Sequence, residues 1–200
     1  MKGGVSVEKA KRCQWVKGNR WNMLYHDAEW GVPVHDDRKL FEFLILEGAQ
    51  AGLSWLTILK RREAYRQAFD NFDFVKIACY NDEKIESLMD NKGIIRNRRK
   101  IEAAVNNARR FIELVDTHGS FDTYIWSFVK HKTIQNAWES PEEIPSETDI
   151  SREMSRELKK KGFKFVGPTI CYAFMQATGM VNDHETGCFR HEEIQLLSKN

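Results

Sequence analysis

Apolar residues recur at helical spacing along nearly the whole chain, and this pattern constrains the fold more than any other feature of the sequence. No stretch alternates convincingly between apolar and polar residues with the period of two that a half-buried strand requires. With 200 residues, of which 42% are hydrophobic, the chain is long enough to bury a core. We therefore expect an all-α protein that forms one ordinary domain, or two small lobes of one.

Capping and breaking residues divide this pattern into separate helices. Asp36 or Asp37 can cap a helix that breaks near Gly52, and Pro168 suits the first position of another. Residues 130–149 contain two prolines and are predicted to form one long irregular connection. The predicted helices span residues 37–51, 54–69, 73–80, 81–91, 97–116, 120–129, 151–161 and 168–179.

The net charge of the chain is too small to attract a polyanion by itself. The chain has 31 basic and 29 acidic residues, a net charge of +2, so an anionic partner needs a local basic patch. No uncharged run reaches the roughly 20 apolar residues that cross a bilayer. Residues 1–12 lack the apolar segment of a signal peptide and are expected to be a flexible leader. We expect a cytoplasmic protein without a membrane partner.

Two Cys/His pairs occupy opposite ends of the chain. Cys13 pairs with His26, and His184 pairs with Cys188. Two thiolates and two imidazoles suit tetrahedral zinc, and four ligands leave no open position, so such a metal is structural and tethers the two ends. The alternative is that each is an isolated core thiol or surface imidazole. The remaining cysteines, Cys79 and Cys171, lie on apolar helix faces and are predicted to be core residues.

Glu47 falls on the apolar stripe of its predicted helix, where packing alone does not place a carboxylate. A buried carboxylate needs a partner or a function. The alternative is a glutamate near the helix end that turns outward. Aromatic residues close in sequence suggest a slot for a flat, nitrogen-rich or cationic ring, namely Trp21, Tyr25, Trp30 and Trp55.

The turn at residues 162–169 joins two predicted helices through glycines, and its backbone N–H groups precede a helix N-terminus. Such a turn can hold a phosphate without a basic side chain. Any helix–turn–helix connection can contain two glycines, so the pattern alone is weak. Four lysines around it supply a local positive field: Lys159, Lys160, Lys161 and Lys164.

Five segments of the sequence resemble one known family, 3-methyladenine DNA glycosylase I. They are YHDAEWGVP (25–33), LEGAQAGLSWLTILKRREAY (46–65), GIIRNRRKI (93–101), IWSFV (125–129) and KGFKFVGPTICYAFMQATGMVNDH (161–184). The likeness covers nearly the whole chain from Cys13 to Cys188. It implies an all-α helix-hairpin-helix fold, hydrolytic removal of N3-methyladenine from alkylated double-stranded DNA, and a structural zinc on the two Cys/His pairs.

The resemblance also implies residue roles and an organisation. Glu47 becomes the catalytic residue of the base pocket, with Tyr25, Trp55 and Trp21 binding the base, and Leu53 becomes the wedge that fills the gap left by a flipped nucleotide. The hairpin residues expected at DNA are Gly162, Lys164, Val166, Gly167 and Thr169. Residues 13–190 would form one catalytic unit of two helical lobes with the active-site cleft between them, followed by a C-terminal tail over 191–200. We expect a monomer.

The sequence departs from the pattern of the wider superfamily at three positions. A pocket tyrosine of some relatives falls at Asn22, and the superfamily's catalytic aspartate falls at Asn182 unless the register shifts to Asp183. The lysine of bifunctional members falls at Thr169, so no Schiff-base lyase step is expected. The missing aspartate leaves an alternative from another class, a non-catalytic zinc-containing module that binds DNA or senses damage.

Overall fold

The computed structural model describes residues 11–197. Within that range, helices dominate, as the periodicity predicts, and none is long and apolar enough to cross a membrane. The α-helices are α1 (Arg20–Ala28), α2 (Asp37–Gln50), α3 (Trp55–Leu59), α4 (Arg62–Ala68), α5 (Phe74–Ala78), α6 (Asp82–Asp90), α7 (Arg98–His118), α8 (Phe121–Trp126), α9 (Asp149–Lys160), α10 (Pro168–Ala177) and α11 (Phe189–Leu197).

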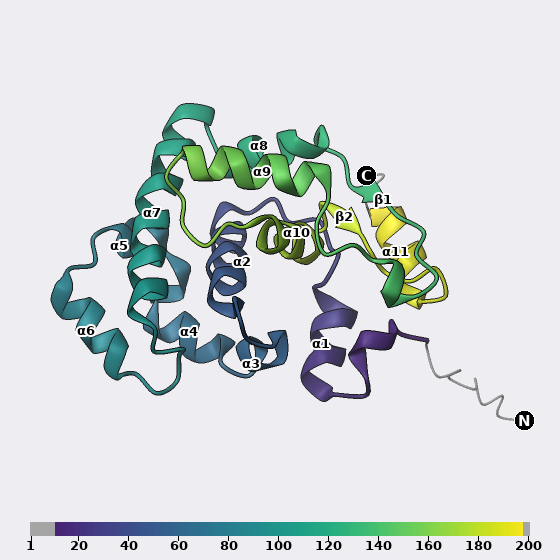
Figure 1. Cartoon of the computed structure of the whole chain (residues 1–200), viewed down its shortest axis with the longest axis horizontal. Coiled ribbons are helices and arrows are strands. Elements are labelled where there is room, and N and C mark those ends of the chain that lie inside the picture. The colour runs from purple at the N-terminus through teal and green to yellow at the C-terminus, as the bar shows by residue number, and fades with distance from the viewer. Residues whose placement is uncertain (1–10, 198–200) are drawn as a thin grey trace, which may run out of the picture.

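Helix α2 lies at the centre of the molecule, and every residue from Leu40 to Ala49 is buried. It begins at the cap Asp36, whose carboxylate accepts the backbone N–H of Lys39. Helices α7, α8 and α10 pack against it, and α9 covers α10 (Figure 1). The central helix therefore holds the buried carboxylate of Glu47 where several elements meet.

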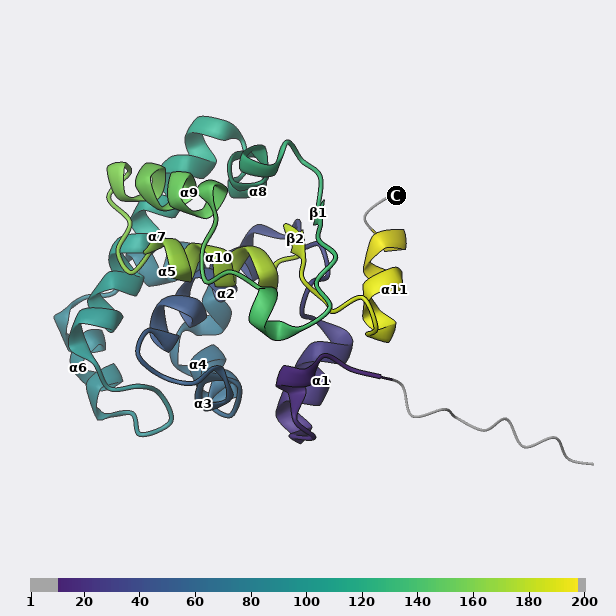
Figure 2. The same cartoon turned by 45° about the vertical axis from the view of Figure 1, so that its right-hand side comes forward.

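The ends of the chain come together on one side of the fold. Figures 1 and 2 show α1 and α11 as neighbours there, although α1 starts at residue 20 and α11 at residue 189. The backbone N–H of Phe189 donates to the carbonyl of Lys11, and Arg12 forms a bidentate ion pair with Asp27. The last two residues of the expected leader are thus packed, while residues 1–10 lie outside the described range.

Two predicted boundaries and one predicted burial need correction. The predicted helix 54–69 is divided into α3 and α4 by a break at Lys60 and Arg61. The expected tail over 191–200 contains most of α11, whose Ile194 is fully buried; residues 198–200 lie outside the described range. Cys79 is exposed at the end of α5, whereas Cys171 is buried as predicted.

The long connection between α8 and α9 is irregular, as predicted, but it carries a short strand that the sequence did not suggest. Strand β1 (Ile134–Gln135) pairs in parallel with β2 (Val181–Asn182), which follows α10. A 3-10 helix over Pro141–Glu143 lies further along the connection. The pairing fixes the connection beside α10.

Candidate functional site

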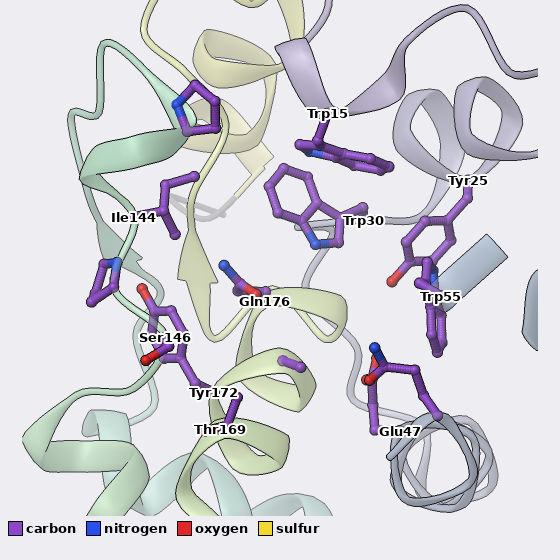
Figure 3. Close-up of a pocket in the computed structure, with 14 residues that line it drawn as sticks. Trp15, Tyr25, Trp30, Glu47, Trp55, Ile144, Ser146, Thr169, Tyr172 and Gln176 are labelled. Carbon is purple, nitrogen blue, oxygen red and sulfur yellow. The ribbon is translucent and has the colours of Figure 1, made fainter. Parts of the chain in front are cut away.

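A cavity of about 380 Å³ opens between α1, α2 and α3 on one side and α10 and the long connection on the other (Figure 3). This size suits a small flat molecule. The lining is mainly aromatic and apolar with a few polar groups: Trp15, Tyr25, Trp30, Glu47, Gln50, Trp55, Pro141, Ile144, Pro145, Ser146, Thr169, Tyr172, Ala173 and Gln176.

Glu47 lines this cavity from the end of α2 and is only 3% exposed. No other residue within 11–197 donates a hydrogen bond to its carboxylate. Burial raises the pKa of Glu47 to about 8, against a smaller opposing effect of the Arg62 charge. Among residues 11–197, the buried carboxyl therefore lacks the protein donor that a buried anion normally has.

Aromatic rings form the walls next to Glu47. The rings of Tyr25 and Trp55 have centroids 5.3 Å apart, and those of Trp15 and Trp30 are 5.2 Å apart in an edge arrangement. The indole N–H groups of Trp15 and Trp55 are buried and have no hydrogen-bond partner in the part of the chain that the structure describes. Burial is also the main cause that raises the pKa of Tyr25. The arrangement offers flat surfaces for a ring together with donors and an acceptor that lack partners.

Trp21 does not belong to this wall, in contrast to its predicted role. It lies one turn before Tyr25 in α1, and 48% of it is exposed. Trp15, which the sequence interpretation missed, lines the cavity instead. Trp15 could have been predicted from its position two residues after Cys13. If Cys13 joins the C-terminal ligands, the residues that follow it must lie close to the cavity.

An ion-pair network centred on the buried Arg62 connects the helices that carry the Tyr25 and Glu47 side of the cavity. The Arg62 guanidinium donates two hydrogen bonds of 2.8 Å to the Glu29 carboxylate and one of 2.7 Å to Glu42. It also lies over the Phe43 ring, 5.1 Å from the centroid. The pKa of Glu42 is lowered despite its burial because Arg62 and Lys39 are close. The network joins α2 and α4 to the end of α1, which carries Tyr25.

The four predicted metal ligands meet in one buried cluster. Their donor atoms lie within 4.8 Å of one another, although Cys13 and Cys188 are 175 positions apart in the chain. Cys188 Sγ is 3.3 Å from His26 Nε2, and Cys13 Sγ is 3.5 Å from His184 Nδ1. A tetrahedron with zinc–sulfur and zinc–nitrogen bonds of ordinary length has edges of about 3.5 Å. The donor set and its spacing fit such an ion.

The second ring nitrogen of each histidine has its own partner. His26 Nδ1 lies 2.8 Å from the Asp27 carboxylate, and His184 Nε2 lies 3.0 Å from the carbonyl oxygen of Trp30. These acceptors fix a tautomer that leaves the other nitrogen of each ring free for a metal, as is usual around metal-bound histidines. A hydrogen bond from Cys13 lowers the pKa of the Cys188 thiol well below its usual value. The same contact raises the pKa of the Cys13 thiol, so the two sulfur atoms share one short interaction within the cluster.

The predicted hairpin between α9 and α10 is held by two asparagines of α7. Asn107 Nδ2 donates to the Lys164 carbonyl, and its Oδ1 accepts the Lys164 backbone N–H. Asn106 donates to the carbonyl of Gly162, which has a φ of +86° that favours glycine. Lys164 is exposed, whereas Val166 is buried. The hairpin is thus held against α7 and presents Lys164 at its surface.

The tip of the hairpin touches α2 beside Glu47. A Cβ on Gly48 would lie 3.3 Å from the Cβ of Phe165, so glycine permits this close approach. Thr169 at the start of α10 lines the cavity itself. Leu53, the predicted wedge, is 39% exposed in the turn between α2 and α3. These predicted residues therefore lie on elements that border the cavity.

Together, these features define a helical protein with an aromatic-walled cavity that holds one buried carboxyl, and with a Cys/His cluster next to it. The family model for methyladenine glycosylase matches residues 15–191. DNA-3-methyladenine glycosylase 1 of Escherichia coli K12 is 50% identical over 178 residues, which cover 89% of this chain and 95% of that protein.

Solved structures agree with this likeness. A crystal structure of 3-methyladenine DNA glycosylase I superposes with a TM-score of 0.88 at 51% identity and covers 90% of this chain and 100% of that one. A substituted form of such an enzyme in complex with 3-methyladenine superposes with a TM-score of 0.86 at 36% identity and covers 89% and 96%. The chain belongs to the methyladenine glycosylase family, as its sequence motifs indicate.

Proposed function

We propose that this protein is a monofunctional DNA glycosylase that removes N3-methyladenine from alkylated double-stranded DNA by hydrolysis. The observation that carries the proposal is the buried, unpartnered carboxylate of Glu47 between aromatic walls. N3-methyladenine in DNA is a flat cation with an exocyclic amino group, so it supplies the donor and the charge that this carboxylate lacks. The family membership and the relative in complex with 3-methyladenine support the same substrate.

In the proposed reaction, the flipped base enters the cavity and stacks against Tyr25 and Trp55. Glu47 accepts a hydrogen bond from the base edge and stabilises its positive charge. The C1′–N9 bond breaks, its electron pair neutralises the departing base, and water forms the new bond to C1′ while releasing a proton to solvent. The positive charge already weakens the glycosidic bond, so binding and extrusion supply much of the catalysis. No dedicated strong base is required.

The residues near the superfamily's aspartate position agree with a reaction that lacks such a base. Asn182 is fully buried and donates hydrogen bonds to Gln135 and to the carbonyl of His191. Asp183 already accepts hydrogen bonds on both of its oxygens. Thr169 at the cavity wall offers no amine for a Schiff base. A simple hydrolysis that leaves an abasic site is the remaining course.

We also propose how the protein holds DNA. The backbone of the helix-hairpin-helix turn at residues 162–169, assisted by Lys164, binds a phosphate, and Leu53 occupies the space that the flipped nucleotide leaves. The unit of residues 13–190 acts as two lobes with the cavity between them, and it acts as a monomer. The exposure of Leu53 and Lys164 at the surface supports these assignments.

The Cys/His cluster is proposed to hold one structural zinc ion on Cys13, His26, His184 and Cys188. Four protein ligands leave no open coordination position, so the metal stabilises structure and takes no part in the reaction. Two observations support the zinc ion. The four buried donor atoms have the spacing of a tetrahedral site, and each histidine has a second ring nitrogen that is held by its own partner. The ion would tie the N-terminal segment to the end of β2 and the start of α11.

The activity is tested by incubating the protein with DNA treated with dimethyl sulfate and identifying the released bases by chromatography. We expect free 3-methyladenine from the wild type and release slower by about two orders of magnitude from Glu47→Gln, with the fold intact. Glu63→Gln is a matched control, because Glu63 is an exposed glutamate on α4, and it should release base at the wild-type rate.

Two outcomes would contradict the proposal. Salt-dependent DNA binding without any release of base would favour the alternative of a non-catalytic module. Wild-type release by Glu47→Gln would remove the assigned role of the carboxylate while leaving the activity itself in place.

A further inference from the structure

Asp183 accepts hydrogen bonds from four side chains, although it is only 1% exposed. Its Oδ2 accepts from the Tyr172 hydroxyl at 2.7 Å and from Gln176 Nε2 at 2.8 Å. Its Oδ1 accepts from Asn136 Nδ2 at 2.6 Å and from Trp138 Nε1 at 2.8 Å. All four donors are neutral N–H and O–H groups, and two of them reach each carboxylate oxygen.

Asp183 links two walls of the cavity. Tyr172 and Gln176 line it from α10, and Figure 3 shows both side chains on the side opposite Glu47. Asn136 and Trp138 belong to the long connection, which also contributes Pro141 and residues 144–146 to the cavity lining. One carboxylate thus holds the helix and the connection in a fixed relation, which gives the irregular connection a place in the site.

The chemistry of the carboxylate determines which atoms these side chains leave for a ligand. A carboxylate only accepts hydrogen bonds, so the Gln176 amide must face Asp183 with its NH₂ group and keep Oε1 for other partners. Within residues 11–197, that oxygen accepts no hydrogen bond. The Tyr172 proton is committed to Asp183 in the same way, so its oxygen can offer only lone pairs. Both groups are therefore acceptors toward the cavity.

We propose that Asp183 is a positioning residue that fixes Gln176 and Tyr172 as acceptors, and that this wall selects an amino-bearing, cationic purine over one that presents a carbonyl oxygen. The inference rests on the proposed function and deepens it. Glu47 and the acceptor wall then face the base from two sides. A purine carbonyl at this wall would meet lone pairs only and would lose a hydrogen bond that it makes in water.

The test is the affinity for two free bases, measured by calorimetry: 3-methyladenine, and 3-methylhypoxanthine, in which a carbonyl oxygen replaces the amino group. In Asp183→Asn, the new amide donates toward Gln176, whose amide turns and directs its NH₂ group into the cavity. We expect affinity for 3-methyladenine to fall about tenfold and the preference over 3-methylhypoxanthine to narrow.

The double variant Asp183→Asn with Gln176→Glu exchanges the amide and the carboxylate at constant net charge. In this variant the substituted side chain at position 176 accepts from the new asparagine and presents an oxygen to the cavity again. We expect it to recover most of the affinity and the preference. A purely structural role of Asp183 predicts no such recovery, since the second change does not restore the original set of four hydrogen bonds.

Each result has a defined meaning. Failure of the wild type to release 3-methyladenine from alkylated DNA would overturn the proposed function, whereas release without a preference for 3-methyladenine over 3-methylhypoxanthine would overturn only the acceptor wall. If the wild type binds, then an Asp183→Asn protein with unchanged affinity and preference, or a folded double variant without recovery, would overturn only the positioning role. If Asp183→Asn does not fold, Gln176→Leu keeps Asp183 and removes the acceptor; unchanged affinity and preference in that variant would also overturn the inference.

Discussion

At the scale of single residues, burial of the Glu47 carboxyl lowers the free energy of unfolding at pH values where the unfolded chain ionises this group. The unfolded chain ionises this group above pH of about 4.3, whereas burial raises its pKa in the folded protein to about 8. The folded state therefore holds an extra proton between these values, and the free energy of unfolding decreases as pH rises through the interval. Each unit of pKa difference is worth about 1.4 kcal/mol.

Glu47→Gln should remove this dependence. We expect the variant to be more stable than the wild type by a few kcal/mol at a pH of about 8 and nearly equal to it at a pH of about 4.5. Urea denaturation at several pH values measures the difference. Glu63→Gln is the control, because Glu63 is exposed and its change should leave the wild-type dependence in place. Parallel pH profiles for wild type and Glu47→Gln would contradict the buried, raised pKa.

Binding of a cation should show the opposite pH dependence. A positive ring beside Glu47 favours the carboxylate, so binding below the raised pKa releases a proton. With the 3,9-dimethyladeninium cation as a probe, affinity should rise by up to about tenfold per pH unit between pH of about 5 and 7. Calorimetry in buffers of different ionisation enthalpy detects the proton. Glu47→Gln should bind weakly with a flat profile, and a flat wild-type profile would exclude this pairing.

The sequence predicted Glu47 because a carboxylate on an apolar stripe is detectable from periodicity alone. It did not distinguish Trp15 from Trp21, since both are tryptophans near Cys13 and only the packing of the N-terminal segment decides which one lines the cavity. Cys79 was misjudged for a similar reason. It lies at the end of a five-residue helix, where periodicity determines the buried face poorly.

At the scale of elements, Lys100 joins the start of α7 to the end of α2. Its Nζ donates to the carbonyls of Ala49 at 2.8 Å and Ala51 at 2.7 Å, which no intrahelical donor satisfies at a helix end. A cation at a helix C-terminus is also favourable toward the helix dipole. Leu53 follows two residues later, and its N–H donates to the Gln50 carbonyl. Lys100 thus steadies the turn that carries the proposed wedge.

Lys100→Met should slow excision from duplex DNA by several-fold to about tenfold, because the wedge turn loses two charge-assisted hydrogen bonds. Binding of free 3-methyladenine should stay within about twofold, since the wedge is not needed there. Rates on methylated duplex and single-stranded DNA are the measurement, with exposed Lys76→Met as control. Equal losses on both DNA forms would show that Lys100 acts on something other than the wedge.

Element boundaries with chemical markers were predicted well. Asp36, one of the two caps predicted for its helix, accepts the backbone N–H of Lys39. The helices predicted to start at residues 81 and 97 begin there with Asn81 and Asn97 as caps. Other features depend on distant partners. Strand β1 exists because residues 134–135 meet β2, which lies much later in the chain, and two residues are too few for any periodicity. Helix α11 has a weak pattern and depends on docking near the Cys/His cluster.

At the scale of the whole molecule, the two ends of the chain form one structure. Cys13 and His26 come from the N-terminal segment and α1, whereas His184 and Cys188 come from the segment between β2 and α11. Trp30, whose carbonyl accepts from His184, also lines the cavity. The Cys/His cluster and the base cavity therefore share a wall, and loss of the cluster should disturb base binding as well as the chain ends.

The double variant Cys13→Ser with Cys188→Ser tests this connection. Elemental analysis of the wild type should find one equivalent of zinc, and the variant should lack it. The variant loses both the metal's binding free energy and the link that closes a very long loop. We therefore expect its melting temperature to fall by more than about 10 °C. Binding of 3-methyladenine should weaken because Trp15 and Trp30 lose their fixed positions. Cys171→Ser, a buried cysteine remote from the cluster, is the control and should keep its zinc.

Removing the metal from the wild type distinguishes a zinc ion that stabilises the joined chain ends from one that binds there without stabilising them. If zinc stabilises the wall, removing it from the wild type with a chelator should reproduce the variant's lower melting temperature, and adding zinc back should restore both stability and base affinity. Hydrogen exchange should then increase in α1 and α11 before it increases in α2, because residues 40–49 of α2 are all buried. A metal-free wild type with unchanged melting temperature and base affinity would show that packing alone joins the chain ends.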